Sequence, residues 1–178
     1  MELMTFNQFD AHAMTIYDHA ASEQLGGDYW CVVNTFRYYV GSPDSKMWVE
    51  VPKGYLTDGA SIPRPLWNIL PPWGKYGQAA IVHDYLCDYG FVLMDGKPVE
   101  INRAETDRIL SESMGALGVP ALKRSIIMSG VNLHRVVMRP GTTNIIPEKA
   151  ALEEERANIT FLSDELVKRN REYKRQGG

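Results

Sequence analysis

The stretch KYGQAAIVHDYLCDYGFVLMDGKPVEI, residues 75–101, decides the fold class, because a helical pattern passes directly into a hairpin pattern. Lys75–Tyr89 has apolar residues at helical spacing and ends at Gly90, a residue that often terminates helices. In Phe91–Ile101, Asp95-Gly96 separates two short apolar runs and predicts a tight β-hairpin. A helix followed by a local antiparallel hairpin favours an α+β fold over an alternating α/β fold.

The chain before this stretch carries strand signals. Tyr29–Val40 is rich in β-branched and aromatic residues, and Met47–Val51 resumes the same pattern. Between them, residues 41–45 (GSPDS) have strong turn chemistry, so the two runs predict a β-hairpin. Tyr55–Thr57 predicts a further short extended piece.

The remaining segments predict helices. Ala11–Gln24 is a weak helical run before a glycine pair. Asn102, with Glu105 three residues later, resembles a capping box that opens a helix reaching Leu117. Pro120 opens another helix at its favoured first position, and this helix continues to about Arg139.

The predicted architecture is therefore α+β, with an N-terminal antiparallel hairpin or small sheet packed on a helical core and a C-terminal helix. We divide the chain into a core domain over residues 1–140, a linker over 141–147 and a charged C-terminal helix over 148–178. Within the last part, the residues that predict helix are Glu148–Lys174.

Composition narrows the classes of protein. The chain has 178 residues, of which 44% are hydrophobic, enough for a core without a structural staple. Its formal net charge of −3 argues against a nucleic-acid partner. Cys31 and Cys87 form no CxxC pair, which argues against a zinc-thiolate site. We find no signal-peptide pattern and no run of about 18 apolar residues that would span a membrane.

The loop Thr57–Arg64, TDGASIPR, joins the predicted strands to the helices and is a candidate functional segment. Junction loops often carry function because a rigid scaffold positions them. The alternative is structural: Asp58 and Ser61 accept backbone bonds in a turn that prolines stiffen. Arg64 has the fork of donors that holds substrate oxyanions.

His83 and Asp84 are the second candidate pair. His83 shares a helix face with small and apolar residues, which predicts that its imidazole points inward. Asp84 follows about 100° round the helix, so one site can use both only if it straddles two faces. The structural alternative is a core histidine bonded to a carbonyl or carboxylate.

Asp107 lies on a helical stripe that continues through core-like residues, so its carboxylate needs a cation, a donor or a metal. Arg103, one turn earlier, is the ordinary alternative partner. We assign Glu105 to capping instead of chemistry.

Mixed nitrogen and oxygen ligands that suit zinc or manganese are offered together by Asp58, His83, Asp84 and Asp107. The sequence therefore predicts a metal-dependent hydrolase in which Asp84, Ser61 and Arg64 serve catalysis and substrate orientation.

Several of these segments resemble one known family. Its core signature is similar to VPKGYLTDGASIPR at 51–64, LPPWG at 70–74 and AAIVHDYL at 79–86, followed by the Arg103–Asp107 helix and ALGVP at 116–120. These motifs resemble the domain-of-unknown-function family 1353 over about Val51–Arg139. Members are typically encoded by tailed phages and prophages. The resemblance implies a phage origin and implies no reaction.

The tail supplies an alternative function. Leu152, Ile159, Leu166 and Tyr173 recur every seventh residue, with Leu162 on the same seam. This helix either docks on the core or binds partners, as a homo-oligomer or with phage structural proteins. The alternative to a hydrolase is thus a non-enzymatic virion or assembly component whose polar residues form a structural network. In either case we expect the protein in the host cytoplasm or the phage particle.

Overall fold

The computed structural model describes residues 8–59, 74–138 and 145–159, and it confirms the predicted α+β class. In chain order the elements are β1 (Thr15–Tyr17), α1 (His19–Leu25), β2 (Trp30–Val32), β3 (Phe36–Tyr39), β4 (Met47–Val51), β5 (Leu56–Thr57), α2 (Gly77–Tyr89), β6 (Phe91–Met94), β7 (Lys97–Glu100), α3 (Arg103–Ala116), α4 (Ala121–Met138) and α5 (Pro147–Ala157). The strands form two antiparallel sheets, in the orders β1-β2-β5 and β3-β4-β6-β7.

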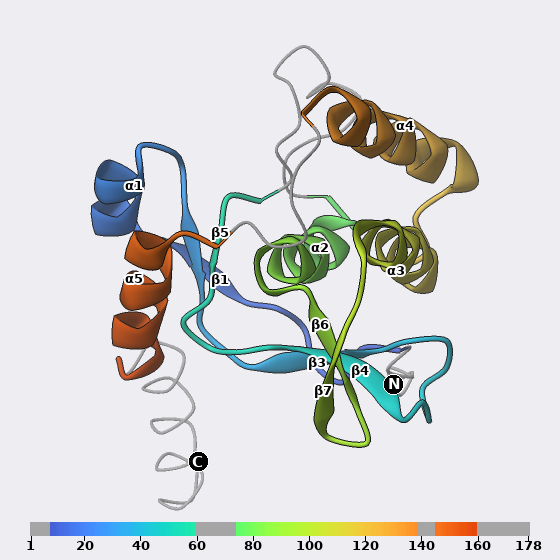
Figure 1. Ribbon diagram of the computed structural model, residues 1–178, viewed down its shortest axis with the longest axis horizontal. Helices are drawn as coiled ribbons and strands as arrows, with labels where there is room; N and C mark the ends of the chain where they lie inside the picture. The colour runs from blue at the N-terminus through green and yellow to red at the C-terminus, as the bar shows by residue number, and fades with distance from the viewer. Residues whose placement is uncertain (1–7, 60–73, 139–144, 160–178) are drawn as a thin grey trace, which may run out of the picture.

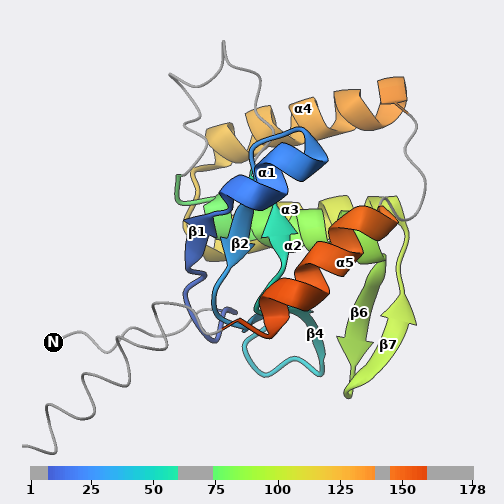
Figure 2. The same ribbon diagram turned by 90° about the vertical axis from the view of Figure 1, so that its left-hand side faces the viewer.

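The described elements are arranged in layers, as Figures 1 and 2 show. Helices α2 and α3 lie over the four-stranded sheet, and α4 covers them on the side away from that sheet. Helices α1 and α5 pack together beside the three-stranded sheet. The main core joins the sheet to α2 and α3 through residues such as Tyr38, Val49, Ile81, Leu86 and Ile109. No helix in the described ranges is long and apolar enough to cross a membrane.

Both predicted hairpins are confirmed. In the first, β3 pairs with β4 from Phe36 opposite Val51 to Tyr39 opposite Trp48. In the second, β6 and β7 flank Asp95 and Gly96, with φ values of 48° and 78°. Two left-handed residues in a two-residue loop are the mark of a type I′ turn, whose twist matches that of the strands.

The predicted helix boundaries are mostly confirmed. Helix α2 ends before Gly90, which has the left-handed φ of 70°, and α3 begins after Asn102, whose side chain accepts from the Glu105 N–H at 3.0 Å. The C-terminal helix predicted over Glu148–Lys174 is present as α5 up to Ala157 and is interrupted at Asn158. There Asn158 forms a turn, and its side-chain amide donates to the Glu154 carbonyl. Residues 160–178 lie outside the described part of the chain.

The predicted helix over Ala11–Gln24 is wrong in its first half. Thr15–Tyr17 forms β1 instead, because this β-branched and aromatic segment pairs with β2. The helix begins only after Asp18, whose side chain caps it by accepting from the Ala21 N–H at 2.9 Å. Tertiary pairing thus overrides a weak local helical pattern.

The continuous strand pattern of Tyr29–Val40 also divides. Asn34 separates β2 from β3, and these two strands belong to different sheets. Its carboxamide accepts from the Met14 N–H at 2.8 Å and donates to the His12 carbonyl at 2.9 Å. A side chain therefore takes over strand-like hydrogen bonding where the chain changes sheets.

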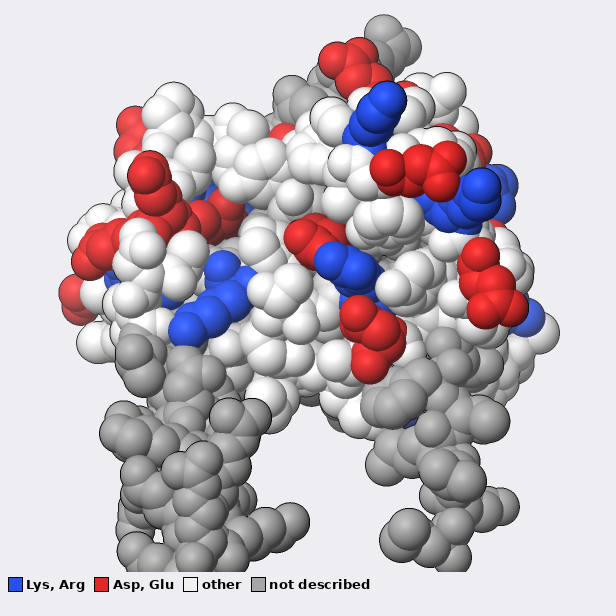
Figure 3. Space-filling view, turned by 90° about the horizontal axis from the view of Figure 1, so that it is seen from below, with Lys and Arg blue, Asp and Glu red and all other residues white. Residues whose placement is uncertain are grey.

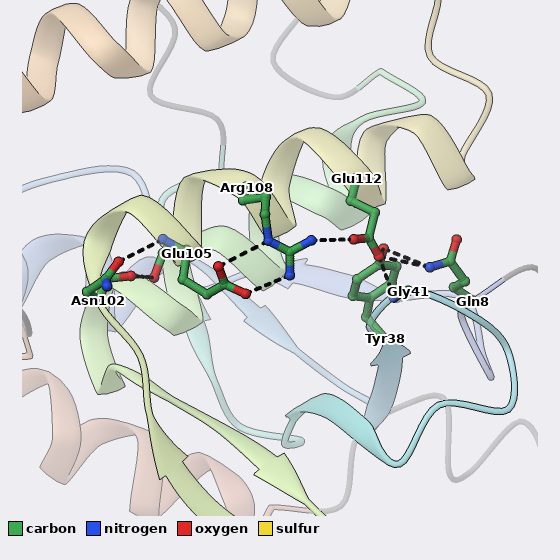
Figure 4. Close-up of polar contacts among 8 residues, drawn as sticks. Gln8, Tyr38, Gly41, Asn102, Glu105, Arg108 and Glu112 are labelled. Atoms are coloured by element: carbon green, nitrogen blue, oxygen red, sulfur yellow. Dashed lines mark hydrogen bonds and ion pairs between the residues drawn. The ribbon is translucent and has the colours of Figure 1, made fainter.

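Glu112 on α3 fastens this helix to the first hairpin (Figure 4). Its Oε1 accepts from Tyr38 Oη at 2.6 Å, from the Gly41 N–H at 2.6 Å and from Gln8 Nε2 at 3.0 Å. Its Oε2 accepts from Arg108 at 2.9 Å. Burial by itself would raise the pKa of Glu112, but these donors together hold it below its ordinary 4.5.

We predict that Glu112→Ala lowers the free energy of unfolding by about 3 kcal/mol, because it leaves the buried Tyr38 hydroxyl without its charged acceptor and removes the bonds to three further donors. Since the folded pKa of Glu112 is lowered, its contribution is complete above pH 4.5 and is lost as the pH falls below that value. Urea unfolding at several pH values measures both effects.

Glu105→Ala is the matched control. Glu105 bonds the same Arg108 near the surface, and its loss should cost no more than about 1 kcal/mol. Equal losses in the two variants would show that Glu112 is no more than a surface ion-pair partner.

Candidate functional site

Helix α2 carries the candidate residues on two faces. Its apolar residues Ile81, Val82 and Leu86 are buried in the core. His83 faces α3, whereas the next residue, Asp84, faces β5. The structure therefore places the two candidates in two separate polar contacts.

His83 pairs with Asp107 of α3. The sequence analysis expected the Asp107 carboxylate to need a cation, a donor or a metal. His83 Nε2 lies 3.0 Å from Asp107 Oδ1, and the two side chains are only 15% and 6% exposed. This contact links the middle of α2 to α3. Two of the four predicted metal ligands thus converge across 24 residues of sequence.

Cys87 is a residue that the sequence analysis left aside. One helical turn after His83, its Sγ lies 3.8 Å from Nδ1 and 3.7 Å from Nε2 of that imidazole. A cysteine, a histidine and an aspartate in contact invite comparison with thiol hydrolases. However, burial raises the pKa of the Cys87 thiol to about 12. A thiol of this kind stays protonated at neutral pH and is a poor nucleophile.

Asp84 is held by Thr57. The Thr57 hydroxyl donates to Asp84 Oδ2 at 2.6 Å and accepts from the Gly59 N–H at 3.0 Å. Burial raises the pKa of Asp84 well above its usual 3.8, and the charge of Asp58 raises it further. The Thr57 bond and the nearby Lys149 charge act in the opposite direction without cancelling this rise. Asp84 therefore keeps its proton to a higher pH than an ordinary aspartate.

Asp58 itself is exposed, directly after β5, and it acts on Asp84 through its charge. Ser61 and Arg64, the other candidates of the Thr57–Arg64 loop, lie outside the described residues. The structure thus shows how the first three residues of this loop meet α2. Their position is fixed by β5, where Leu56 pairs with Cys31 and Thr57 with Trp30.

The four predicted ligands form two arrangements in the structure, His83 with Asp107 and Asp84 beside Asp58. Within residues 8–59, 74–138 and 145–159, no three His, Cys, Asp or Glu side chains are grouped closely enough to hold a metal. A zinc or manganese centre built from Asp58, His83, Asp84 and Asp107 remains a prediction.

A buried ionic cluster next to Asp84 was missed by the sequence analysis. Lys149 of α5 forms an ion pair with Asp88 of α2, which also accepts from Tyr55 Oη at 2.7 Å. Glu153 Oε1 lies 3.5 Å from Lys149 Nζ, and Glu153 also accepts from the Tyr89 hydroxyl. The available signal in the sequence was the four-residue spacing of charged residues, Asp84 with Asp88 and Lys149 with Glu153. Nothing in the local sequence indicates that α2 and α5 meet.

The described part of α5 docks on its own chain. Leu152, the first residue of the predicted heptad, is buried against Cys31 and Leu56, whereas Ile159 is 43% exposed. Leu162, Leu166 and Tyr173 lie outside the described residues. Gly54 makes the close approach possible, because a Cβ there would lie 2.5 Å from the Ala157 nitrogen.

The surface charges are mixed. On the face shown in Figure 3, acidic and basic side chains of the described residues lie beside one another. Ion pairs among the described residues include Arg37 with Glu50, whose Nε and Oε2 are 2.6 Å apart. A mixed surface of this kind offers no extended basic track for a phosphate backbone on that face.

We predict that neither cysteine is alkylated by iodoacetamide at pH 7.5 in the folded protein, because burial raises the pKa values of both Cys31 and Cys87 to about 12. Both should react fully in urea. Mass spectrometry of the labelled peptides measures this, and rapid labelling of native Cys87 would restore it as a candidate nucleophile.

Comparison with known proteins agrees with the motifs. The chain is 44% identical over 48 residues to the uncharacterised protein y4jT of Sinorhizobium fredii (strain NBRC 101917 / NGR234). This alignment covers 26% of the chain and 14% of that protein, so the chain spans a small part of its relative. No solved structure gives a significant match. The family model described as "protein of unknown function (DUF1353)" matches residues 30–131, which include β2 to β7, α2, α3 and most of α4, and the chain therefore belongs to this family.

Proposed function

We propose that this protein is a hydrolase whose site lies where Thr57, Asp58 and Gly59 meet helix α2 at Asp84. The observation that carries the proposal is the state of Asp84. Its carboxyl group is oriented by a 2.6 Å bond from a buried threonine, and its pKa is raised by burial and by Asp58. An oriented carboxyl group that keeps its proton to a higher pH than an ordinary aspartate is the kind of group that enzymes use for proton transfer.

Asp58 and Asp84 make a pair of carboxyl groups in unlike environments. Asp58 is exposed, whereas Asp84 is partly buried against Thr57. Enzymes use such pairs to divide acid and base roles between two chemically similar side chains. In this proposal Asp84 moves the proton, and Asp58 polarises an incoming water.

The metal-dependent form of the proposal uses the same two carboxylates. Zinc or manganese held between Asp58 and Asp84 would lower the pKa of a bound water and supply the nucleophile. His83 and Asp107 are the further ligands predicted from the sequence, and Ser61 and Arg64 are the predicted substrate-orienting residues. The proposed site has Asp84 as its central residue, and its other members are Asp58, Ser61, Arg64, His83 and Asp107.

A second candidate function is a non-enzymatic component of a phage particle or of its assembly, in the host cytoplasm or the virion. The observation that favours it is the pairing of the candidate residues with one another, as in His83 with Asp107 and Asp84 with Thr57. The phage setting comes from the family resemblance. Homo-oligomers or phage structural proteins would then bind through the C-terminal segment.

Asp84→Asn separates the two candidates. Above pH 3.8 the folded protein holds the Asp84 proton more tightly than the unfolded chain does, so stability falls as the pH rises toward the folded pKa. Asparagine keeps the acceptor for Thr57 and removes this loss. We therefore predict that the variant unfolds at a higher urea concentration than the parent at pH 7, and that this advantage disappears as the pH falls toward 3.8.

The same variant should lose about 100-fold or more of any hydrolysis of bis-p-nitrophenyl phosphate, p-nitrophenyl phosphate or p-nitrophenyl acetate. Asp44→Asn, in the exposed turn after β3, is the control and should change neither quantity. If Asp84→Asn destabilises the protein and no substrate is hydrolysed, the structural network is the better account.

Metal binding has its own test. Zinc or manganese added to chelator-treated protein should raise the melting temperature, because a ligand at 100 times its Kd stabilises the native state by about 2.7 kcal/mol. Asp58→Asn and Asp84→Asn should each reduce the rise. His19→Ala removes the exposed His19–Glu23 pair, and a rise that this variant abolishes would assign the binding to that surface pair instead.

A further inference from the structure

Helix α5 docks on the core through a face that is mostly charged. Lys149, Glu153 and Arg156 are each 7% exposed, and so is Leu152 on the same face. Because burying charges is costly, an ionic docking face is weak evidence for a purely stabilising role. The groups that surround each buried charge therefore decide what this face recognises.

The Lys149 ammonium is enclosed by three oxygen atoms and an aromatic ring. It forms an ion pair with Asp88, and its Nζ lies 3.5 Å from both Tyr55 Oη and Glu153 Oε1. Nζ also lies 4.5 Å from the centre of the Tyr55 ring, within the range of a cation–π contact. Since an ammonium carries three N–H donors, the three oxygen atoms match its hydrogen-bonding capacity.

Two members of this cage, Tyr55 and Asp88, belong to the core and are also held by contacts with the core. Tyr55 is 1% exposed, and its Oη donates to Asp88 Oδ2 at 2.7 Å. The Tyr55 carbonyl accepts from the Val32 N–H at 2.8 Å, and the neighbouring Gly54 N–H donates to the Val32 carbonyl at 2.8 Å. The ring face and the carboxylate are thus oriented by bonds that do not involve α5.

Lys149 occupies the cage in its charged form. Burial acts against the charge, but the charge and the hydrogen bond of Asp88, with the charge of Glu153, raise the pKa of Lys149 above its ordinary 10.5. Lysine also fits the shape of the cage, because its ammonium is compact and ends a flexible alkyl chain, whereas arginine ends in a wide planar fork.

We infer that Tyr55 and Asp88 form a binding site for a primary alkylammonium ion, and that Lys149 of α5 is its resident ligand. Both core residues lie within residues 30–131, the part matched to the family, whereas the ligand comes from a helix outside that part. Docking of α5 is thereby selected by one ammonium group at one position of the helix. The site requires none of the chemistry proposed for Asp84.

Lys149→Ala in the full-length protein tests this site, because it removes the atoms of one n-propylammonium ion. The variant should melt at a lower temperature than the parent, and n-propylammonium chloride should restore part of the loss in a saturable manner. At ten times its Kd the ion should raise the melting temperature by about 3–6 °C. The parent, whose cage is filled by Lys149, should show no such rise at the same chloride concentration.

Two further compounds separate recognition of the ammonium from general solvent effects. n-Propanol has the same carbon chain without the charge, and tetramethylammonium has the charge without N–H donors. Neither should stabilise Lys149→Ala, and Asp88→Asn introduced into that variant should abolish the effect of n-propylammonium. An effect that is equal for the three compounds, or that survives Asp88→Asn, would overturn the inference.

Arg156→Ala is the matched control on the same helix. Arg156 is equally buried, and its Nε and Nη2 donate to Asp18 Oδ2 and Oδ1 at 2.8 and 3.3 Å. Its loss should also weaken the docking of α5, but n-propylammonium should have little effect, because that contact suits a guanidinium fork. A rise equal to that in Lys149→Ala would mean that the ion stabilises any protein with a weakened α5 contact, and the assigned site would then be wrong.

Lys149→Ala leaves Asp88 without its cation, so the variant can lose its fold. In that event the measurement is refolding from urea in n-propylammonium chloride or in sodium chloride at the same concentration, followed by circular dichroism. Recovery of the native helix signal in n-propylammonium alone would support the site. Equal recovery in the two salts, or none in either, would count against it.

Discussion

The burial of helix α2 is the constraint on which the rest of the structure depends. This helix lies between the four-stranded sheet and α4, yet within two helical turns it carries the polar residues His83, Asp84 and Asp88 as well as its apolar face. A buried polar group without a partner costs about 1–3 kcal/mol, and a charged group costs more. Each of these three side chains therefore needs a polar partner, and each partner comes from a different neighbouring element.

These three partners link α2 to parts of the chain that are distant in sequence. Asp107 brings α3 to His83, Thr57 brings β5 to Asp84, and Lys149 brings α5 to Asp88. Two of these partners lie within residues 30–131, the part matched to the family, whereas Lys149 lies outside it. Within the family-matched part Asp88 accepts from Tyr55 Oη at 2.7 Å, whereas the cation that pairs with it comes from α5.

The sequence predicted those elements whose signals are local. The turn at Asp95-Gly96, the cap at Asn102 and the stop at Gly90 each need only a few neighbouring residues, and all three are present. The strand Thr15–Tyr17 and the break at Asn34 could not be read in this way, because both depend on which strand pairs with which. Hydrophobic periodicity does not encode that choice.

The same distinction applies to the site. An inward-facing His83 and a carboxylate on the core-facing stripe of α3 were both inferred from helical spacing, and the structure brings them together. The contact of Lys149 with Asp88 spans 61 residues and joins two charged helices. Charged residues at a spacing of four are common on solvated helix faces, so the pattern of α5 favoured exposure. Burial of that face follows from Gly54, which admits the helix backbone.

Two carboxyl groups of this protein show what separates a structural acid from a candidate reactive one. Glu112 accepts from Tyr38, the Gly41 N–H, Gln8 and Arg108, and its pKa is lowered. Asp84 accepts from Thr57 beside two other carboxylates, and its pKa is raised. The hydrogen-bond donors around Glu112 stabilise its charged form. The bond from Thr57 does not offset the cost of burying a charged Asp84. Carboxyl groups whose pKa is raised in this way are typical of sites that transfer a proton or bind a cation.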